Sequence, residues 1–272
     1  MEIKEVFAKS SLVPSKLSQF TINPYLGCGH GCKYCYASMI MQRWYHKGEL
    51  WGDFVDVRIN TPQNVEREVK NRHKIDVYMS SMTDCYQPLE KEYNMTRKTL
   101  EVLLRHEQGL FPSKNSITIQ TKSRLVLRDI DIIKQFTDLT VGVTITTLDT
   151  DYSEILEPFA SNPYERLETL ENLNRENIKT YAFFGPLLPG ISDSFKTMYK
   201  MIASIQEAGT KTVIVDKLNY FTNLKRLQDV SKTINLFEQF RISDTENYVS
   251  SLREKVIALR EEFPKIDFRI VF

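Results

Sequence analysis

Short apolar runs alternate with longer amphipathic stretches along most of this chain. The runs are rich in β-branched residues and have the length of buried strands. Six of them predict strands at residues 20–25, 76–80, 116–121, 140–146, 179–184 and 212–216. Apolar residues at helical spacing predict helices between the strands, at residues 37–47, 94–107, 125–136, 163–174 and 194–208. Strand and helix therefore alternate throughout this part of the chain.

Signals at the helix ends agree with these boundaries. Asn162 followed by Pro163 is typical of a helix start, and Gly209 is typical of a helix end. Regular alternation of strands and helices predicts an α/β fold, with a parallel sheet covered by helices. In parallel α/β barrels the functional side chains lie at the carboxyl ends of the strands, so we expect site residues directly after each strand.

The alternation weakens after residue 217. A further helix is expected at residues 249–263 and a further strand at residues 267–272. We expect this C-terminal extension, residues 218–272, to pack on the core at residues 18–217, so that residues 1–272 form a single domain. The chain has 272 residues, of which 42% are hydrophobic, and this is enough for one sizeable core.

Charge and hydropathy restrict the classes of partner. The chain has 36 Lys and Arg against 35 Asp and Glu, so its net charge of +1 gives no argument for binding duplex DNA. No apolar run has the length of a membrane span. Residues 1–9 are charged and mixed, without the apolar run of a secretory signal. We therefore expect a cytoplasmic protein that does not insert into a membrane.

Three of the four cysteines lie close together in the sequence. Cys28, Cys32 and Cys35 have the spacing C-x3-C-x2-C, which is typical of soft-metal binding and would leave one thiol over in a disulfide pairing. A zinc site would need a fourth ligand, normally from a second CxxC or a histidine pair. Three thiolates match a 4Fe–4S cluster with one iron left open. A zinc knuckle, inert thiols and a ligand role for His30 are the alternatives.

The cysteine motif, with Tyr34 just before its third cysteine, resembles the radical S-adenosylmethionine (radical SAM) superfamily. The flanking residues, 21–28 and 30–37, resemble the branch that contains spore photoproduct lyase and many uncharacterised relatives labelled DNA repair photolyases. The resemblance runs from about residue 9 to about residue 216. It implies a partial (β/α)6 TIM-type barrel, a 4Fe–4S cluster on the three cysteines, and S-adenosylmethionine at the open iron.

The resemblance also assigns cofactor contacts to side chains that follow the predicted strands. Ser80, Ser81 and Asp84 follow the second strand and would contact the methionyl amine; the alternative is an ordinary turn with local hydrogen bonds. Lys122 follows the third strand and would pair with the methionyl carboxylate; the alternative is a solvated surface lysine.

Three further residues complete the implied cofactor site. Thr144 stands where relatives have a serine that bonds the ribose, and Thr146 shares its face of the fourth strand. Threonine is also a normal strand residue, which is the alternative for both. Tyr34, as the aromatic residue of the cysteine motif, is expected to contact the cofactor.

Cys85 is the fourth cysteine and stands where relatives more often have proline. A thiol near the cofactor could donate a hydrogen atom to a radical, whereas most lone cysteines are small apolar core residues. Spore photoproduct lyase uses a cysteine in its C-terminal half as the donor. This chain has no cysteine after Cys85. We therefore expect that it does not reverse the spore photoproduct by that route.

The resemblance implies an enzyme that cleaves S-adenosylmethionine to a 5′-deoxyadenosyl radical, which then removes hydrogen from a substrate. The substrate is a nucleic-acid base or lesion in the first hypothesis, and a peptide or small molecule in the second. A third hypothesis, from another class, is a non-enzymatic metal-binding module. An enzyme of this kind needs a one-electron reductant such as flavodoxin or ferredoxin.

Overall fold

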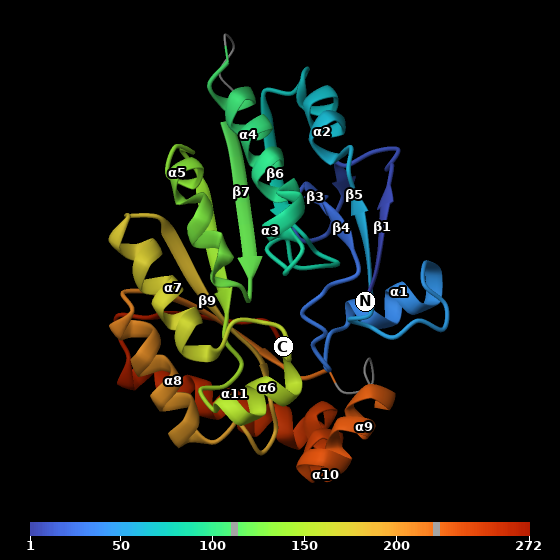
Figure 1. The fold of residues 1–272 in the computed structure, drawn as a ribbon. Coiled ribbons are helices and arrows are strands. Elements are labelled where there is room, and N and C mark those ends of the chain that lie inside the picture. The colour runs from blue at the N-terminus through green and yellow to red at the C-terminus, as the bar shows by residue number, and fades with distance from the viewer. Residues whose placement is uncertain (110–113, 220–223) are drawn as a thin grey trace.

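The computed structural model describes residues 1–109, 114–219 and 224–272. Its main element is an eight-stranded sheet (Figure 1). In spatial order the strands are β11 (Asp267–Ile270), β10 (Thr212–Lys217), β9 (Lys179–Leu187), β8 (Leu139–Thr144), β7 (Lys114–Thr121), β6 (Lys74–Met79), β3 (Phe20–Ile22) and β2 (Val13–Pro14). All neighbouring strands in the sheet are parallel except β2 and β3.

Helices follow each of the six predicted strands, as the alternation predicted. They are α1 (Ala37–Trp44), α3 (Glu90–Tyr93), α4 (Met95–Glu107), α5 (Ile130–Ile133), α6 (Thr150–Leu156), α7 (Pro163–Arg175), α8 (Phe195–Glu207), α9 (Leu224–Ile234), α10 (Phe237–Arg241) and α11 (Glu246–Glu262). Figure 1 shows α4, α5, α7 and α8 along one side of the curved sheet. The predicted α/β fold with a parallel sheet is confirmed.

The strands alternate between two environments, and this alternation places the site. Val77, Ile119 and Val141 are fully buried in the main hydrophobic core. Their neighbours Tyr78 and Gln120 point to the other side of the sheet, where they line a cavity. Because successive side chains of a strand face opposite sides, the apolar side of the sheet packs on the helices and the polar side surrounds the cavity.

The first predicted strand, residues 20–25, is wrong in one respect, because it divides into two. β3 ends at Ile22, and after Asn23 and Pro24 the chain enters β4 (Tyr25–Leu26), which belongs to a second sheet. Proline lacks the backbone N–H that a continuous strand would use in the ladder. The second sheet has the order β1 (Glu2–Val6), β5 (Phe54–Arg58) and β4, and the hydrophobic pattern did not predict it.

Other boundaries shift for local reasons. The helix predicted at residues 125–136 is a 3-10 segment, η1 (Arg124–Asp129), followed by the short α5. The helix α2 (Thr61–Val69) and the 3-10 turn η2 (Ile242–Asp244) were not predicted. In the C-terminal extension β11 adds to the edge of the main sheet beside β10, while residues 220–223 lie outside the described residues.

The predicted helix ends at α7 and α8 are confirmed. The Asn162 side chain accepts a hydrogen bond from the Glu165 backbone N–H, and Glu165 caps Asn162 in return. α8 ends before Gly209, whose φ of +83° is the left-handed conformation that glycine adopts easily. Within the described residues, none of the helices combines the length and the apolar character needed to cross a membrane.

Candidate active site

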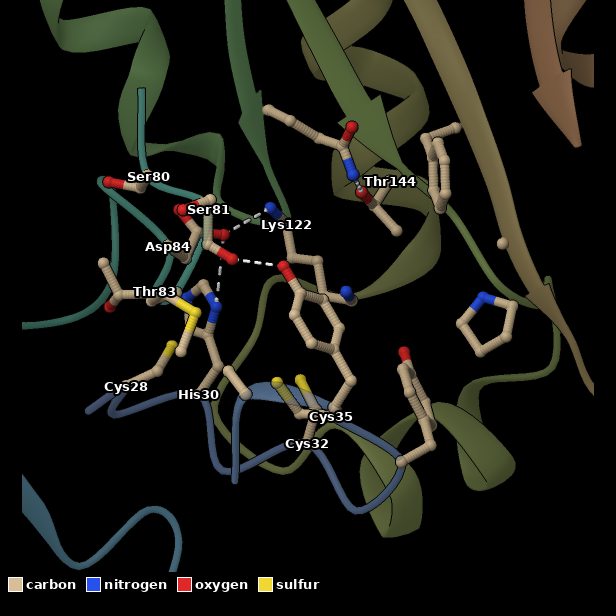
Figure 2. A pocket seen from close by; sticks show the side chains of 18 of the residues that line it. Cys28, His30, Cys32, Cys35, Ser80, Ser81, Thr83, Asp84, Lys122 and Thr144 are labelled. Carbon is tan, nitrogen blue, oxygen red and sulfur yellow. Dashed lines mark hydrogen bonds and ion pairs between the residues drawn. The ribbon is translucent and has the colours of Figure 1, made fainter. Parts of the chain in front are cut away.

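A cavity of about 220 Å³ opens at the carboxyl ends of the parallel strands (Figure 2). Its lining combines the cysteine loop with residues at the carboxyl ends of β6, β7, β8, β9 and β10 and in the loops directly after β6, β7 and β10. Of the candidate residues, it includes Cys28, Cys32, Tyr34, Cys35, Ser80, Ser81, Asp84, Lys122 and Thr144. The structure therefore brings together nine of the eleven residues singled out from the sequence, while Cys85 and Thr146 are not part of the lining.

The three clustered cysteines face one wall of this cavity (Figure 2). Cys28 and Cys32 are buried, and Cys35 is half-buried. Tight turns shape the loop: the Gly31 N–H donates to the Cys28 carbonyl at 3.2 Å, and the Cys35 N–H donates to the Cys32 carbonyl at 3.3 Å. The short spacing between the cysteines is therefore accommodated by turns that keep all three thiols on the same side.

Residues that follow β6 hold the start of the cysteine loop. The Thr83 hydroxyl donates to the Gly27 carbonyl at 2.6 Å, and the Gly29 N–H donates to Gln87 Oε1 at 2.7 Å. Gly27 has a φ of +83°, and a Cβ at this position would lie 2.4 Å from the Phe54 carbonyl oxygen. Only glycine fits there without displacing β5, so the loop path depends on that residue.

Burial favours the protonated form of two thiols of this loop, Cys28 and Cys32. It raises the pKa of Cys28 well above its usual value, with a further contribution from the Asp84 carboxylate. It raises the pKa of Cys32 to about 12, although Lys122 opposes the shift. Metal binding would displace these protons, since the thiolate is the ligand. Among the described residues, no three or more His, Cys, Asp or Glu side chains are arranged around a single metal position in this structure, so the cluster stays a prediction.

Asp84 is fully engaged by protein donors. Oδ1 accepts from the Thr121 hydroxyl at 2.7 Å and from the Tyr86 N–H at 2.8 Å. Oδ2 accepts from the Lys122 N–H at 2.8 Å and lies 3.4 Å from His30 Nδ1. Burial alone would raise the pKa of Asp84, but His30 and these hydrogen bonds outweigh it and hold the pKa below its usual value. Asp84 therefore ties the cysteine loop to the end of β7.

The two serines occupy the turn after β6. Ser80 has a φ of +70°, a left-handed conformation that is uncommon outside glycine and often marks a functional turn. Its N–H donates to the Ile22 carbonyl at 2.8 Å. The Ser81 hydroxyl accepts from the Thr21 hydroxyl at 3.2 Å, and the Ser81 carbonyl accepts from the Tyr36 hydroxyl. Both serines line the cavity.

Lys122 points into the cavity beside the cysteine loop, as Figure 2 shows. Its Nζ lies 5.5 Å from the centre of the Tyr34 ring, a cation–π distance. Within the described part of the chain it makes no salt bridge. The surface-lysine alternative does not describe this side chain, because it lines the cavity.

A buried ion pair, which was not predicted from the sequence, contacts the cysteine loop through Tyr34. Glu157 and Arg166 pair with side-chain exposures of 0% and 1%. The Tyr34 hydroxyl donates to Glu157, and the Thr146 hydroxyl donates to it at 3.1 Å. Thr146 therefore contacts this carboxylate and does not reach the cavity.

A second unpredicted network lies on the cavity side of the strands. Gln120 Oε1 accepts from the Tyr78 hydroxyl at 2.8 Å and from the Tyr181 hydroxyl at 2.9 Å. Its Nε2 donates to the Thr144 hydroxyl at 3.2 Å. Gly142 makes room for the Tyr181 ring, since a Cβ there would lie 2.1 Å from Cζ of Tyr181. This network fixes the orientation of Thr144, which lines the cavity.

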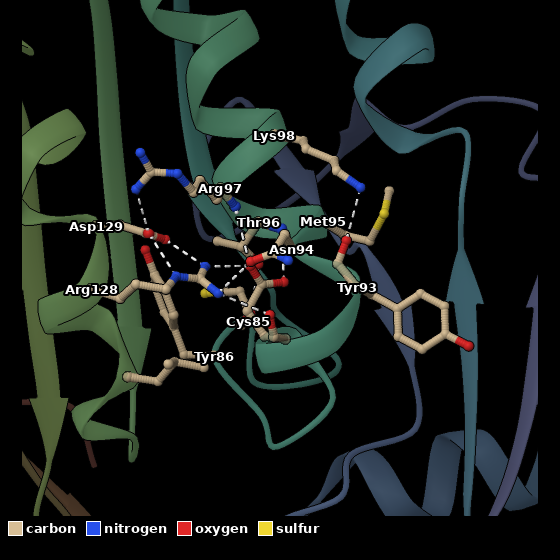
Figure 3. Close-up of polar contacts among 12 residues, drawn as sticks. Cys85, Tyr86, Tyr93, Asn94, Met95, Thr96, Arg97, Lys98, Arg128 and Asp129 are labelled. Carbon is tan, nitrogen blue, oxygen red and sulfur yellow. Dashed lines mark hydrogen bonds and ion pairs between the residues drawn. The ribbon is translucent and has the colours of Figure 1, made fainter.

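Cys85 lies in the main core (Figure 3). Its side chain is fully buried, and its carbonyl accepts a hydrogen bond from the Thr96 hydroxyl at 2.6 Å. Close by, Arg128 pairs with Glu90 and Asp129, both of which have fully buried side chains. These contacts join α3, α4 and η1 around the thiol. The structure places Cys85 in the apolar-filler environment, and its proposed donor role stays a prediction.

Comparison with known proteins identifies the family. The model described as the Radical SAM superfamily matches residues 22–202. An uncharacterized protein of Methanocaldococcus jannaschii is 37% identical over 71% of this chain and 70% of its own length. This chain belongs to the radical SAM superfamily. A relative with a described activity, the Radical SAM Nalpha-GlyT isomerase of Pseudomonas phage M6, is 27% identical over 71% of this chain and 38% of its own length.

Solved radical SAM structures confirm the fold. A spore photoproduct lyase variant with bound AdoMet and dinucleoside spore photoproduct superposes with a TM-score of 0.69, covering 98% of this chain and 81% of that chain. SuiB of Streptococcus suis bound to the precursor peptide SuiA superposes with a TM-score of 0.60, covering 93% of this chain and 48% of that chain. Sequence identities are 10% and 12%, so these likenesses establish only the partial TIM-type barrel.

Proposed function

We propose that this protein is a radical SAM enzyme that binds a 4Fe–4S cluster through Cys28, Cys32 and Cys35. The observation that carries the proposal is the position of these three thiols, together on one wall of the cavity at the strand ends. The chemistry that the superfamily obtains from the cluster and S-adenosylmethionine is reductive cleavage to a 5′-deoxyadenosyl radical, which removes hydrogen from a substrate.

The chain's own residues would bind and orient S-adenosylmethionine. Lys122 reaches the cavity beside the cysteines without an acidic partner in the described residues, and it would donate to the methionyl carboxylate. Ser80 and Ser81 would accept hydrogen bonds from the amine, and the hydroxyl of Thr144 would contact the ribose. Because the carboxylate of Asp84 is engaged by four protein groups, we assign it the positioning of the loop.

Two further residues would support this site without touching the cofactor amine. Tyr34 closes the cavity wall between Cys32 and Cys35 and carries the Lys122 ammonium over its ring. Thr146 would act through Glu157, to which it donates a hydrogen bond. The four cysteines are free thiols, which suits a reducing compartment such as the cytoplasm, where flavodoxin or ferredoxin would supply the electron.

The substrate is drawn from two classes, and each has a structural neighbour. A nucleic-acid base or lesion fits the neighbour whose structure holds a dinucleoside spore photoproduct. A peptide or small molecule fits the neighbour whose structure holds a precursor peptide. The near-neutral net charge of +1 favours a small ligand held inside the cavity over an extended nucleic acid held by a basic surface.

The test is metal analysis with paired cysteine variants. Anaerobically reconstituted protein should carry about four irons per chain, as one cubane on three thiolates requires. Cys32→Ala should lose the iron and the brown colour, whereas Cys85→Ala, which removes the fourth cysteine, should keep both. With dithionite and S-adenosylmethionine the wild type should release 5′-deoxyadenosine. Protein that binds one zinc and no iron would contradict the proposal.

A further inference from the structure

One carboxylate on the cavity wall has no part in the proposed cofactor chemistry. Asp216 lies near the carboxyl end of β10 and lines the cavity together with Phe183, Gly185 and Pro186 of β9. Its Oδ1 accepts from the Lys217 backbone N–H at 2.8 Å, the one hydrogen bond that its side chain makes within the described part of the chain. Its second oxygen is available to a ligand.

The neighbouring cation, Lys217, pairs with a different carboxylate, that of Asp244. Lys217 Nζ forms an ion pair with Asp244 and lies 3.2 Å from Asn219 Oδ1. Burial raises the pKa of Asp216 above its usual value, and the opposing effect of Lys217 does not cancel the shift. A half-buried carboxylate without a cation is unfavourable. A bound cation would remove that cost.

The other charged groups on the cavity wall are accounted for. Asp84 pairs with His30, and Lys217 pairs with Asp244. Lys122 stands beside the cysteine loop, where the proposed function gives it the methionyl carboxylate. Asp216, on the β10 wall of the cavity, is the charge that remains without a partner among the described residues.

Gly185 lies next to both the Phe183 ring and the Asp216 side chain. A Cβ on Gly185 would lie 2.6 Å from Cε1 of Phe183 and 3.0 Å from Cβ of Asp216. A side chain at this position would therefore displace the Phe183 ring or Asp216. A carboxylate beside an aromatic ring is a favourable environment for an organic cation, since both attract positive charge.

We propose that Asp216 and Phe183 form a substrate subsite for a cationic nitrogen, a protonated amine or a guanidinium group. This inference rests on the proposed function, because it assigns the substrate to the wall that the cofactor leaves open. The edge of a neutral nucleobase would give Asp216 a hydrogen bond but no compensating charge. The subsite therefore favours the peptide or small-molecule class of substrate over an uncharged base.

The experiment compares two probes of the same shape on anaerobically reconstituted protein containing S-adenosylhomocysteine. Benzylamine is charged and benzyl alcohol is neutral. Titration calorimetry should show that the wild type binds the amine about tenfold more tightly, the difference expected between a charged and a neutral hydrogen-bond donor. In Asp216→Asn, which keeps the shape and removes the charge, this ratio should fall to about one. Gly185→Ala, which keeps the charge, should also lower it.

Glu238→Gln is the matched control, since it removes an exposed carboxylate from α10 and should leave the ratio unchanged. An equal ratio in wild type and Asp216→Asn would overturn the proposal. The proposal would also be overturned if Asp216→Asn bound S-adenosylhomocysteine more weakly and kept the amine preference. Asp216 would then belong to the cofactor site. A third result would also overturn the proposal: the wild type binds guanosine more tightly than 1-methylguanosine but shows no preference for the amine, and Asp216→Asn loses the guanosine preference. Asp216 would then bind a nucleobase. Failure of the proposed function shows separately, as absent iron and absent S-adenosylhomocysteine binding in the wild type.

Discussion

Replacing Arg166 by Met is the sharpest test of how the cysteine loop is supported. The guanidinium of Arg166 pairs with Glu157 at almost complete burial. It also donates to the Ser161 carbonyl at 2.6 Å and to the Thr144 carbonyl at 3.1 Å. The substitution keeps an apolar side chain of similar length but leaves one buried carboxylate without its cation and two carbonyls without a donor. The damage therefore comes from lost electrostatics more than from lost volume.

The size of the effect follows from these contacts. Removing one partner of a buried ion pair costs about 3–5 kcal/mol. In the variant the hydroxyls of Tyr34 and Thr146 still donate to Glu157, which lowers the cost within that range. The two carbonyls that lose their bond to the guanidinium raise the cost within the same range. For a chain of this size each kcal/mol lowers the melting temperature by about 2–4 °C, so we expect a decrease of about 6–20 °C.

The assay is thermal unfolding of reconstituted protein, followed by circular dichroism and by iron content. The double variant Glu157→Leu/Arg166→Met removes both charges, so it should recover part of the lost stability, because an apolar pair can replace a buried ion pair. The unrecovered part corresponds to the two carbonyls that lose a donor and to the Tyr34 and Thr146 hydroxyls that lose their acceptor. A single variant within about 2 °C of the wild type, or a double variant less stable than the single, would refute the reasoning.

The remaining predictions concern the cofactor and Cys85. Lys122→Ala should weaken binding of S-adenosylmethionine by about 1.5–3 kcal/mol in calorimetry, as expected for a charge-assisted hydrogen bond, while Lys217→Ala should not. Unchanged affinity in Lys122→Ala would exclude it as the carboxylate partner. Reduced enzyme incubated with a dinucleotide spore photoproduct should restore no thymines by chromatography. Robust turnover would contradict this, and turnover lost in Cys85→Ala with the cluster intact would identify that thiol as the donor.

The main sheet could be predicted because its strands are buried on the side that packs against the helices. Val77, Ile119 and Val141 are fully buried and lie in short apolar runs whose length and composition predict strands. The small sheet could not be predicted, since β1 is almost entirely exposed and carries no apolar pattern. The strand β4, at the other edge of this sheet beside β5, is hidden by Pro24, which separates a two-residue strand from an otherwise continuous run.

The candidate site divides in the same way. The cysteine loop and Lys122 could be predicted, because close spacing and position after a strand are visible in the sequence. The Glu157–Arg166 pair could not, since it depends on the packing of α7 against the end of α6. Gln120 could have been noticed as a long polar residue within a buried strand, but its partners depend on the register of three other strands.

The arrangement of charges inside the cavity gives the functional proposals a common basis. The chain as a whole is nearly neutral, so it has no excess charge to attract a polyanion. Selectivity must then come from a few unpaired groups in the interior. Lys122 stands beside the cysteine loop and Asp216 on the β10 wall, and neither has an oppositely charged partner among the described residues. With one such cation and one such anion among the described residues, the cavity would select small ligands that carry both charges, divided between the proposed cofactor and the proposed substrate.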